Sequence, residues 1–170
     1  DTAKDLLCHL DLSEVFQMIL ERAASILGVD NGLIFMYDSQ HEFREVKAAR
    51  GILTPLIGEK PQINTGMLSS ILKTNEPMIV DDYSSWTKRN PSPVFDQVKA
   101  ALAVPLTIRR EVAGIIFFGA TDPAFHFATD AEILLNEFAS LASIAIDNAR
   151  IHNELQSELE ERKRSETQAL

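Results

Sequence analysis

The segment Ala101–Ala120, ALAVPLTIRREVAGIIFFGA, decides the fold class of this chain. Two apolar runs flank the polar stretch Thr107–Glu111, and this pattern predicts two β-strands joined by a turn. In the second run both alternating sets of side chains are apolar, with Val112, Ile116 and Phe118 on one side and Ala113, Ile115 and Phe117 on the other. Because a strand of this kind is covered on both faces, the segment predicts a hairpin in a sheet that is packed between two layers.

The periodicity of apolar residues predicts the elements that precede this hairpin. In chain order they are a helix over about Leu12–Leu27, strands over Gly32–Tyr37 and Phe43–Arg50, a loop over Thr54–Ile63, a short helix around Met67–Leu72, a brief strand from Met78, and a helical turn at Val94–Lys99. This order predicts an α+β fold: an antiparallel sheet of five to six strands with helices on both faces, followed by a long C-terminal helix.

The long helix is expected to begin near Asp130 and to run without a breaker to the end of the chain. One apolar seam follows alternating steps of four and three residues, as in a coiled coil: Leu134, Phe138, Leu141, Ala145, Asn148, His152, Leu155 and Leu159. A second stripe stops earlier: Leu135, Ala139, Ala142, Ile146 and Ala149. One stripe can cover the sheet while the other meets a partner helix.

Beyond residue 153 the first seam continues alone among charged residues. A helix with so narrow an apolar stripe is marginal by itself in water, and a second copy of the same helix would bury that stripe. We therefore expect a lead-in over residues 1–10, which either extends the first helix backwards or stays outside it, a domain over residues 11–153, and a coiled-coil-like linker over residues 154–170 to a downstream domain. The alternative is a solvated helix that frays.

Charge and composition exclude several classes of function. The net charge of −9 argues against nucleic acid, since phosphate binding needs clustered Lys and Arg, and against an anionic membrane surface. The longest apolar run, Ala113–Ala120, is far shorter than the roughly 18 residues of a membrane span, and no signal pattern opens the chain. The single cysteine, Cys8, cannot form an internal disulfide. We expect a cytoplasmic domain.

Three short motifs carry a resemblance to a known family. Val104-Pro105-Leu106, Gly114-Ile115-Ile116 and the AIDNAR segment Ala145–Arg150 match, in this order, motifs that recur in GAF domains. The helix after Gly66 and the following Asn75-Glu76-Pro77 are similar to another segment of that family. The chain therefore resembles a GAF domain, a sensory relative of the PAS fold, over roughly residues 10–153. These motifs mark a fold and do not by themselves fix a function.

The resemblance implies a small-molecule-sensing module of a signal-transduction protein of the histidine kinase or diguanylate cyclase type. Such a module forms a homodimer through its N- and C-terminal helices, and it passes the state of its pocket to an output domain through the C-terminal helix. The tail Leu159–Leu170 is similar to linkers that join GAF domains to PAS, kinase or cyclase modules. A ligand-free scaffold that dimerises constitutively is the alternative.

Two GAF ligands are disfavoured, so the cofactor stays unknown. Phe127, Asp130 and Glu132 match the cyclic-nucleotide signature only loosely, and no Asn-Lys pair precedes them. Covalent bilin attachment needs a cysteine in the pocket region, whereas Cys8-His9 precedes the first core helix.

The resemblance places a ligand pocket between the sheet and the segments that cover one of its faces, which points to residues 78–101. The candidate lining residues are Asp81, Asp82, Tyr83, Trp86, Phe95 and Val98. Pockets are mostly apolar with a few polar groups that fix orientation, and this set has that mixture. The alternative is that Asp81 and Asp82 end a strand and that Trp86 fills the core.

Catalytic and metal-binding patterns are not found in the sequence. The histidines, His9, His41, His126 and His152, fall in four different predicted elements with no pair at helical spacing, so we expect no metal site. No nucleophile–base pair, phosphate-binding glycine loop or Walker motif is visible. We therefore expect no enzyme activity in this chain, although a kinase or cyclase domain is expected elsewhere in the protein.

Overall fold

The computed structural model of the chain describes residues 2–38, 43–61 and 64–169. The elements, in order, are α1 (Thr2–Leu27), β1 (Asn31–Asp38), β2 (Phe43–Arg50), the 3-10 helix η1 (Gly51–Leu56), α2 (Gly66–Thr74), β3 (Met78–Val80), the 3-10 helix η2 (Pro93–Gln97), β4 (Ala100–Ile108), β5 (Glu111–Ala120) and α3 (Ala131–Ala169). The predicted α+β class with its long final helix is confirmed.

The described strands form one five-stranded sheet in the order β2-β1-β5-β4-β3. Every neighbouring pair is antiparallel. The hairpin of β4 and β5 therefore has a strand on each side, and β5 lies in the middle of the sheet. This position explains why both alternating sets of its side chains are apolar.

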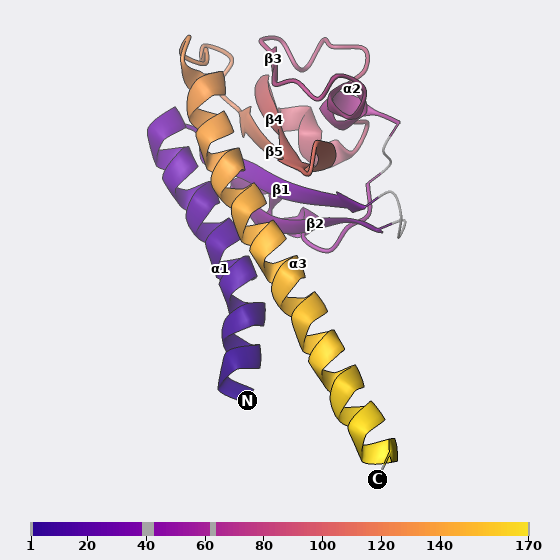
Figure 1. The fold of residues 1–170 in the computed structure, drawn as a ribbon. Coiled ribbons are helices and arrows are strands. Elements are labelled where there is room, and N and C mark those ends of the chain that lie inside the picture. Colours follow the sequence, from indigo (N-terminus) through magenta and orange to yellow (C-terminus); the bar gives the residue numbers. More distant parts are fainter. Residues whose placement is uncertain (1, 39–42, 62–63, 170) are drawn as a thin grey trace.

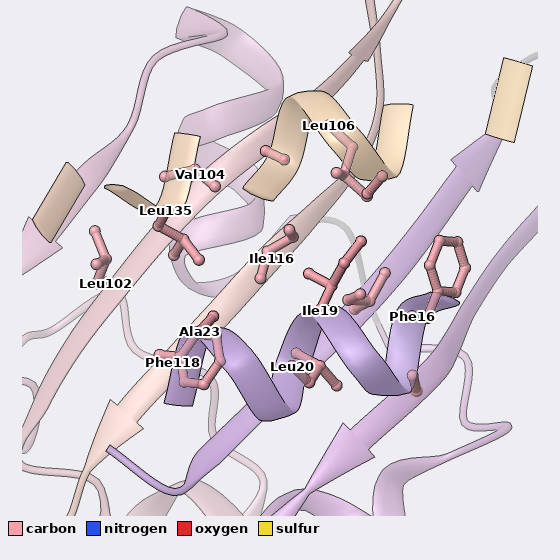
Figure 2. Packing of buried hydrophobic residues seen from close by; sticks show 14 of the residues in the cluster. Phe16, Ile19, Leu20, Ala23, Leu102, Val104, Leu106, Ile116, Phe118 and Leu135 are labelled. Atoms are coloured by element: carbon pink, nitrogen blue, oxygen red, sulfur yellow. The ribbon is translucent and has the colours of Figure 1, made fainter. Parts of the chain in front are cut away.

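One face of the sheet is covered by α1 and α3, which lie side by side (Figure 1). Leu20 and Ala23 of α1 point toward the sheet, and Leu135 of α3 lies beside Leu102 and Val104 of β4 (Figure 2). The described side chains that are buried in this cluster are apolar, so the hydrophobic effect holds the two helices to the sheet. We call this side the helical face.

The other face of the sheet is covered by α2 and by the two 3-10 helices, and we call it the α2 face (Figure 1). The sheet contributes alternate side chains of β1 and β5, Leu33, Phe35, Ile115 and Phe117. Leu53 of η1 and Ile71 of α2 are fully buried against this layer. The two faces thus form two separate apolar layers with the sheet between them.

A β-bulge changes the predicted orientation of two side chains in β5. The register passes from Leu106 opposite Gly114 to Thr107 opposite Val112, so Ala113 is an extra residue on β5. Ala113 consequently packs on the helical face, and Val112 packs on the α2 face. The sequence-based assignment of these two residues was therefore wrong, although the assignments of Ile115, Ile116, Phe117 and Phe118 were correct.

The first helix begins at Thr2, so residues 2–10 extend the helix that was expected over about Leu12–Leu27, as the absence of a breaker in this segment allows. Part of the expected loop over Thr54–Ile63 belongs to η1, where Pro55 is tolerated in a short 3-10 turn. Within the described residues, no helix is both long and apolar enough to cross a membrane.

Candidate functional site

A cavity of about 700 Å³ opens on the α2 face of the sheet. Its floor is formed by side chains of three strands, Leu33, Phe35, Val46, Ile115 and Phe117. Its walls come from η1, from the first turn of α2 and from the segment between β3 and β4. A volume of this size is typical of sites for small organic ligands.

Backbone hydrogen bonds hold the walls of the cavity in place. The Gly66 N–H donates to the Lys88 carbonyl at 2.8 Å, and Gly66 has a φ of +70°, a conformation that glycine adopts readily. The Tyr83 N–H donates to the Lys99 carbonyl, also at 2.8 Å. The start of α2 is thus tied to the irregular segment that closes the cavity, and the two ends of this segment are tied to each other.

Three aromatic rings of the cavity lining, two from its wall and one from its floor, pack against one another. The ring centroids of Phe95 and Phe117 lie 5.6 Å apart with the planes at 85°. Tyr83 lies 6.3 Å from Phe95 and 6.2 Å from Phe117. These separations and the T-shaped contacts are those that aromatic pairs prefer, so this part of the lining is packed by specific ring contacts.

The polar groups of the cavity centre on Tyr83. Its hydroxyl accepts a hydrogen bond from the Asn90 N–H at 3.1 Å, and the Asn90 side-chain oxygen accepts one from the Ser92 N–H at 2.9 Å. Burial raises the pKa of the Tyr83 hydroxyl, while the hydrogen bond from Asn90 and the charge of Arg89 act in the opposite direction. The hydroxyl therefore stays protonated at neutral pH and can donate a hydrogen bond.

The structure separates the predicted pocket residues into three groups. Tyr83 and Phe95 line the cavity. Trp86 and Val98 belong to the same apolar layer but lie behind the lining. Asp81 and Asp82 are exposed and lie outside the cavity. A ligand-binding role for any of these residues stays a prediction.

Neither the floor of the cavity nor Asn90 was predicted from the sequence. The floor could have been inferred from β1, since Leu33 and Phe35 alternate on the side opposite Ile34. Asn90 lies between Arg89 and Pro91 in an irregular segment, and no periodic pattern assigns its position.

α3 carries apolar side chains on two opposite sides, and the exposed set continues beyond the part of the helix that packs on the sheet. The buried face packs on the sheet and contains Ala131, Leu135, Ala139, Ala142 and Ile146. The opposite face is exposed, and we call it the outer stripe: Ile133, Leu141, Ile144, Ile151, Leu155 and Leu159. The spacings within the outer stripe lie close to multiples of the helical repeat, so these six side chains lie on one side of the helix.

The predicted seam runs obliquely between these two faces. Leu134, Phe138, Ala145 and His152 are partly buried, whereas Leu141, Asn148, Leu155 and Leu159 are exposed. A strict seven-residue repeat drifts around a straight helix, which explains the mixture. The outer stripe includes Ile133, Ile144 and Ile151, which the seam omitted. Pairing with a second chain stays a prediction.

One polar contact connects the sheet with α3. Arg109 Nη2 lies 3.5 Å from Asp147 Oδ1, so the turn between β4 and β5 reaches the middle of the helix. Both residues of this turn have positive φ, +52° at Arg109 and +70° at Arg110. Among the described residues, no three His, Cys, Asp or Glu side chains gather closely enough to hold a metal ion.

Comparison with known proteins agrees with this architecture. The family model described as "GAF domain" matches residues 9–147. The GAF domain/HD domain protein from Geobacter sulfurreducens superposes with a TM-score of 0.71 at 18% identity, covering 83% of this chain and 95% of that chain. The GAF domain of a phosphoenolpyruvate-protein phosphotransferase from Coxiella burnetii gives 0.75 at 19% identity, covering 84% and 86%.

A third solved structure, the GAF-B domain of DevS from Mycobacterium smegmatis, has a TM-score of 0.68 at 17% identity and covers 85% of this chain and 98% of that chain. At these identities the structures establish the fold alone. The family model spans most of the sequence, from α1 into the sheet-packed part of α3. On this evidence the chain belongs to the GAF-domain family.

Proposed function

We propose that this chain is a sensory and dimerisation module of a signal-transduction protein. A small molecule occupies the cavity on the α2 face, and α3 passes the state of the cavity to an output domain of the histidine kinase or diguanylate cyclase type. The chain itself performs no catalysis. Two of the similar structures support a modular role, since one is named for a GAF and an HD domain together and the other comes from a phosphotransferase.

The sheet separates the cavity from α3, the helix that carries the signal in this proposal. Ile115 and Phe117 of β5 form part of the cavity floor. Ile116 and Phe118 point the other way, into the layer that contains Leu135 and Ile146 of α3. Because close-packed interiors transmit small displacements, a ligand that moves β5 also changes the packing of α3. The ligand can shift this packing only if it binds one arrangement better than the other.

The outer stripe of α3 is the observation that carries the proposal. Its six large apolar side chains are between 41% and 65% exposed. The sheet covers the opposite side of the helix as far as Ile146, and around Leu155 and Leu159 the helix has no buried residue. Met18 and Ile26 of the neighbouring α1 are exposed as well. A second copy of the chain, packed stripe against stripe, would remove this surface from water.

Sedimentation velocity of the wild-type chain and of Ile144→Glu tests the proposal. Ile144 is 59% exposed, and burying a whole isoleucine side chain is worth about 1.5–3 kcal/mol. Covering the exposed part is therefore worth about 1–2 kcal/mol, and the residue occurs twice in a two-fold dimer. We expect Ile144→Glu to raise the dissociation constant of the dimer at least about 30-fold.

Ile57→Glu is the matched control, since Ile57 is also a half-exposed isoleucine but lies outside both α1 and α3. It should leave the dimer unchanged. A wild-type chain that is monomeric at tens of micromolar, or equal effects of the two substitutions, would contradict the proposal.

The second candidate is a constitutive dimerisation scaffold with no ligand. The exposed stripe supports it equally well, whereas the open cavity favours the sensor. A thermal-shift screen of nucleotides, amino acids and organic acids distinguishes the two, because reproducible stabilisation by one class of compound would exclude the scaffold.

A further inference from the structure

We propose that the cavity on the α2 face takes a neutral molecule built around an aromatic ring, with one acceptor that receives a hydrogen bond from the Tyr83 hydroxyl. This inference rests on the proposed sensory function and adds the chemical class of the ligand. It follows from three properties of the cavity: its described lining has no buried charge, much of that lining is aromatic, and the proton of the Tyr83 hydroxyl has no acceptor among the described residues.

The charged side chains around the cavity favour a neutral ligand over an anion. Among the described lining residues only Glu59 and Lys60 are charged, and these neighbours are exposed and of opposite sign. The nearby Arg89 is already engaged, because its Nη1 donates to Asp96 Oδ1 at 2.9 Å. A carboxylate or phosphate would lose its hydration in this cavity without gaining a buried cation.

The lining favours an aromatic guest over an aliphatic one. Phe35, Tyr83, Phe95 and Phe117 all line the cavity, and three of these rings already pack against one another. A guest ring can extend this cluster through further edge-to-face contacts. Such contacts contribute beyond simple burial, by about three- to tenfold in affinity.

The Tyr83 hydroxyl supplies the orienting group. Its oxygen accepts the Asn90 N–H, but its own proton has no acceptor among the described residues. The residue is almost fully buried, and a buried donor without a partner is costly. An acceptor on the ligand would satisfy it, and the raised pKa described above keeps the proton in place at neutral pH.

Three probes of similar size separate these properties: acetophenone, cyclohexyl methyl ketone and benzoate. The first is aromatic and neutral with a carbonyl acceptor, the second keeps the carbonyl without the aromatic ring, and the third keeps the ring but is an anion. Trp86 is the only tryptophan of the chain and its ring centroid lies 5.9 Å from that of Tyr83. Its single indole N–H cross peak in a ¹H–¹⁵N correlation spectrum therefore reports binding beside Tyr83.

We expect saturable shifts of this cross peak with acetophenone, and affinities for the other two probes that are at least threefold weaker. Tyr83→Phe keeps the ring and removes the donor, so it should weaken acetophenone binding about three- to tenfold. Tyr37→Phe is the matched control, because it makes the same change at the only other tyrosine, which does not line this cavity. The affinity of Tyr37→Phe for acetophenone should equal that of the wild type.

Benzoate or cyclohexyl methyl ketone binding as tightly as acetophenone would overturn the inference. So would an unchanged affinity in Tyr83→Phe, or no shift with acetophenone at millimolar concentration. The sedimentation experiment with Ile144→Glu is independent of these titrations. Dimerisation without acetophenone binding therefore rejects the ligand class alone, and acetophenone binding by a monomeric chain rejects the proposed function alone.

Discussion

Replacing Asn31 by alanine should destabilise the domain far more than its small size suggests. Asn31 is the only polar residue among the buried ones of the described chain, with 8% of its surface exposed. Its side-chain Nδ2 donates to the Gly119 carbonyl at 3.2 Å, and its Oδ1 accepts the Ile52 N–H at 3.0 Å. One amide thus connects the start of β1 with the end of β5 and with η1.

The expected cost follows from these two hydrogen bonds. Each contributes about 0.5–1.5 kcal/mol net, and a buried group that is left without a partner costs about 1–3 kcal/mol. The Gly119 carbonyl and the Ile52 N–H would both lose their partner, although Ile52 is only partly buried. We expect Asn31→Ala to lower the free energy of unfolding by about 2–4 kcal/mol.

Urea unfolding measures this cost. The samples should share one protein concentration, because dimerisation would add to the apparent stability. The midpoint should fall while the slope stays constant, since the same surface is exposed on unfolding. Asn136→Ala is the control, because Asn136 is exposed on α3 and alanine is the better helix former. A loss below about 1 kcal/mol in Asn31→Ala would refute the assignment of Asn31 as the link between these three elements.

Three further substitutions test the backbone and the cavity. In urea unfolding, Gly114→Ala should lower the free energy of unfolding by more than about 3 kcal/mol, because its Cβ would overlap the Phe35 carbonyl oxygen. Gly58→Ala should cost less, since its Cβ meets nothing within 4 Å and only the strain of alanine at φ +86° remains, about 1–2 kcal/mol. Arg110→Gly should raise the free energy of unfolding by about 0.5–1 kcal/mol, because glycine removes the backbone strain of a non-glycine residue at φ +70°. An equal or lower free energy of unfolding would contradict this. Stability should fall as the pH rises above the ordinary tyrosine pKa of 10.0, because burial raises the pKa of Tyr83 and the unfolded chain loses its proton first. Urea midpoints across this range should fall less in Tyr83→Phe.

The α+β class could be predicted because hydrophobic periodicity is a local property. The two apolar sets of β1, for example Leu33 with Phe35 against Ile34 with Met36, separate onto the two faces as the pattern indicates. The exception at Val112 and Ala113 arises from a bulge, and a bulge depends on the register between two strands. No alternation within one strand contains that information.

The candidate site was predicted only in part, because it is assembled from segments that are distant in sequence. Tyr83 and Phe95 could be placed near a pocket from the resemblance, but their contact with Phe117 depends on how the segment after β3 folds back over the sheet. The path of this segment also decides that Asp81 and Asp82 are exposed.

The sequence by itself determined the order of the five strands and the main helices, the two-sided burial of the central hairpin, and the unbroken final helix. These properties follow from the order of apolar and polar residues along the chain. Only the tertiary structure decided which side of α3 is left exposed and which side chains enclose the cavity. The physical reason is that several stripes of a helix are apolar here, and the sheet and α1 can cover only some of them.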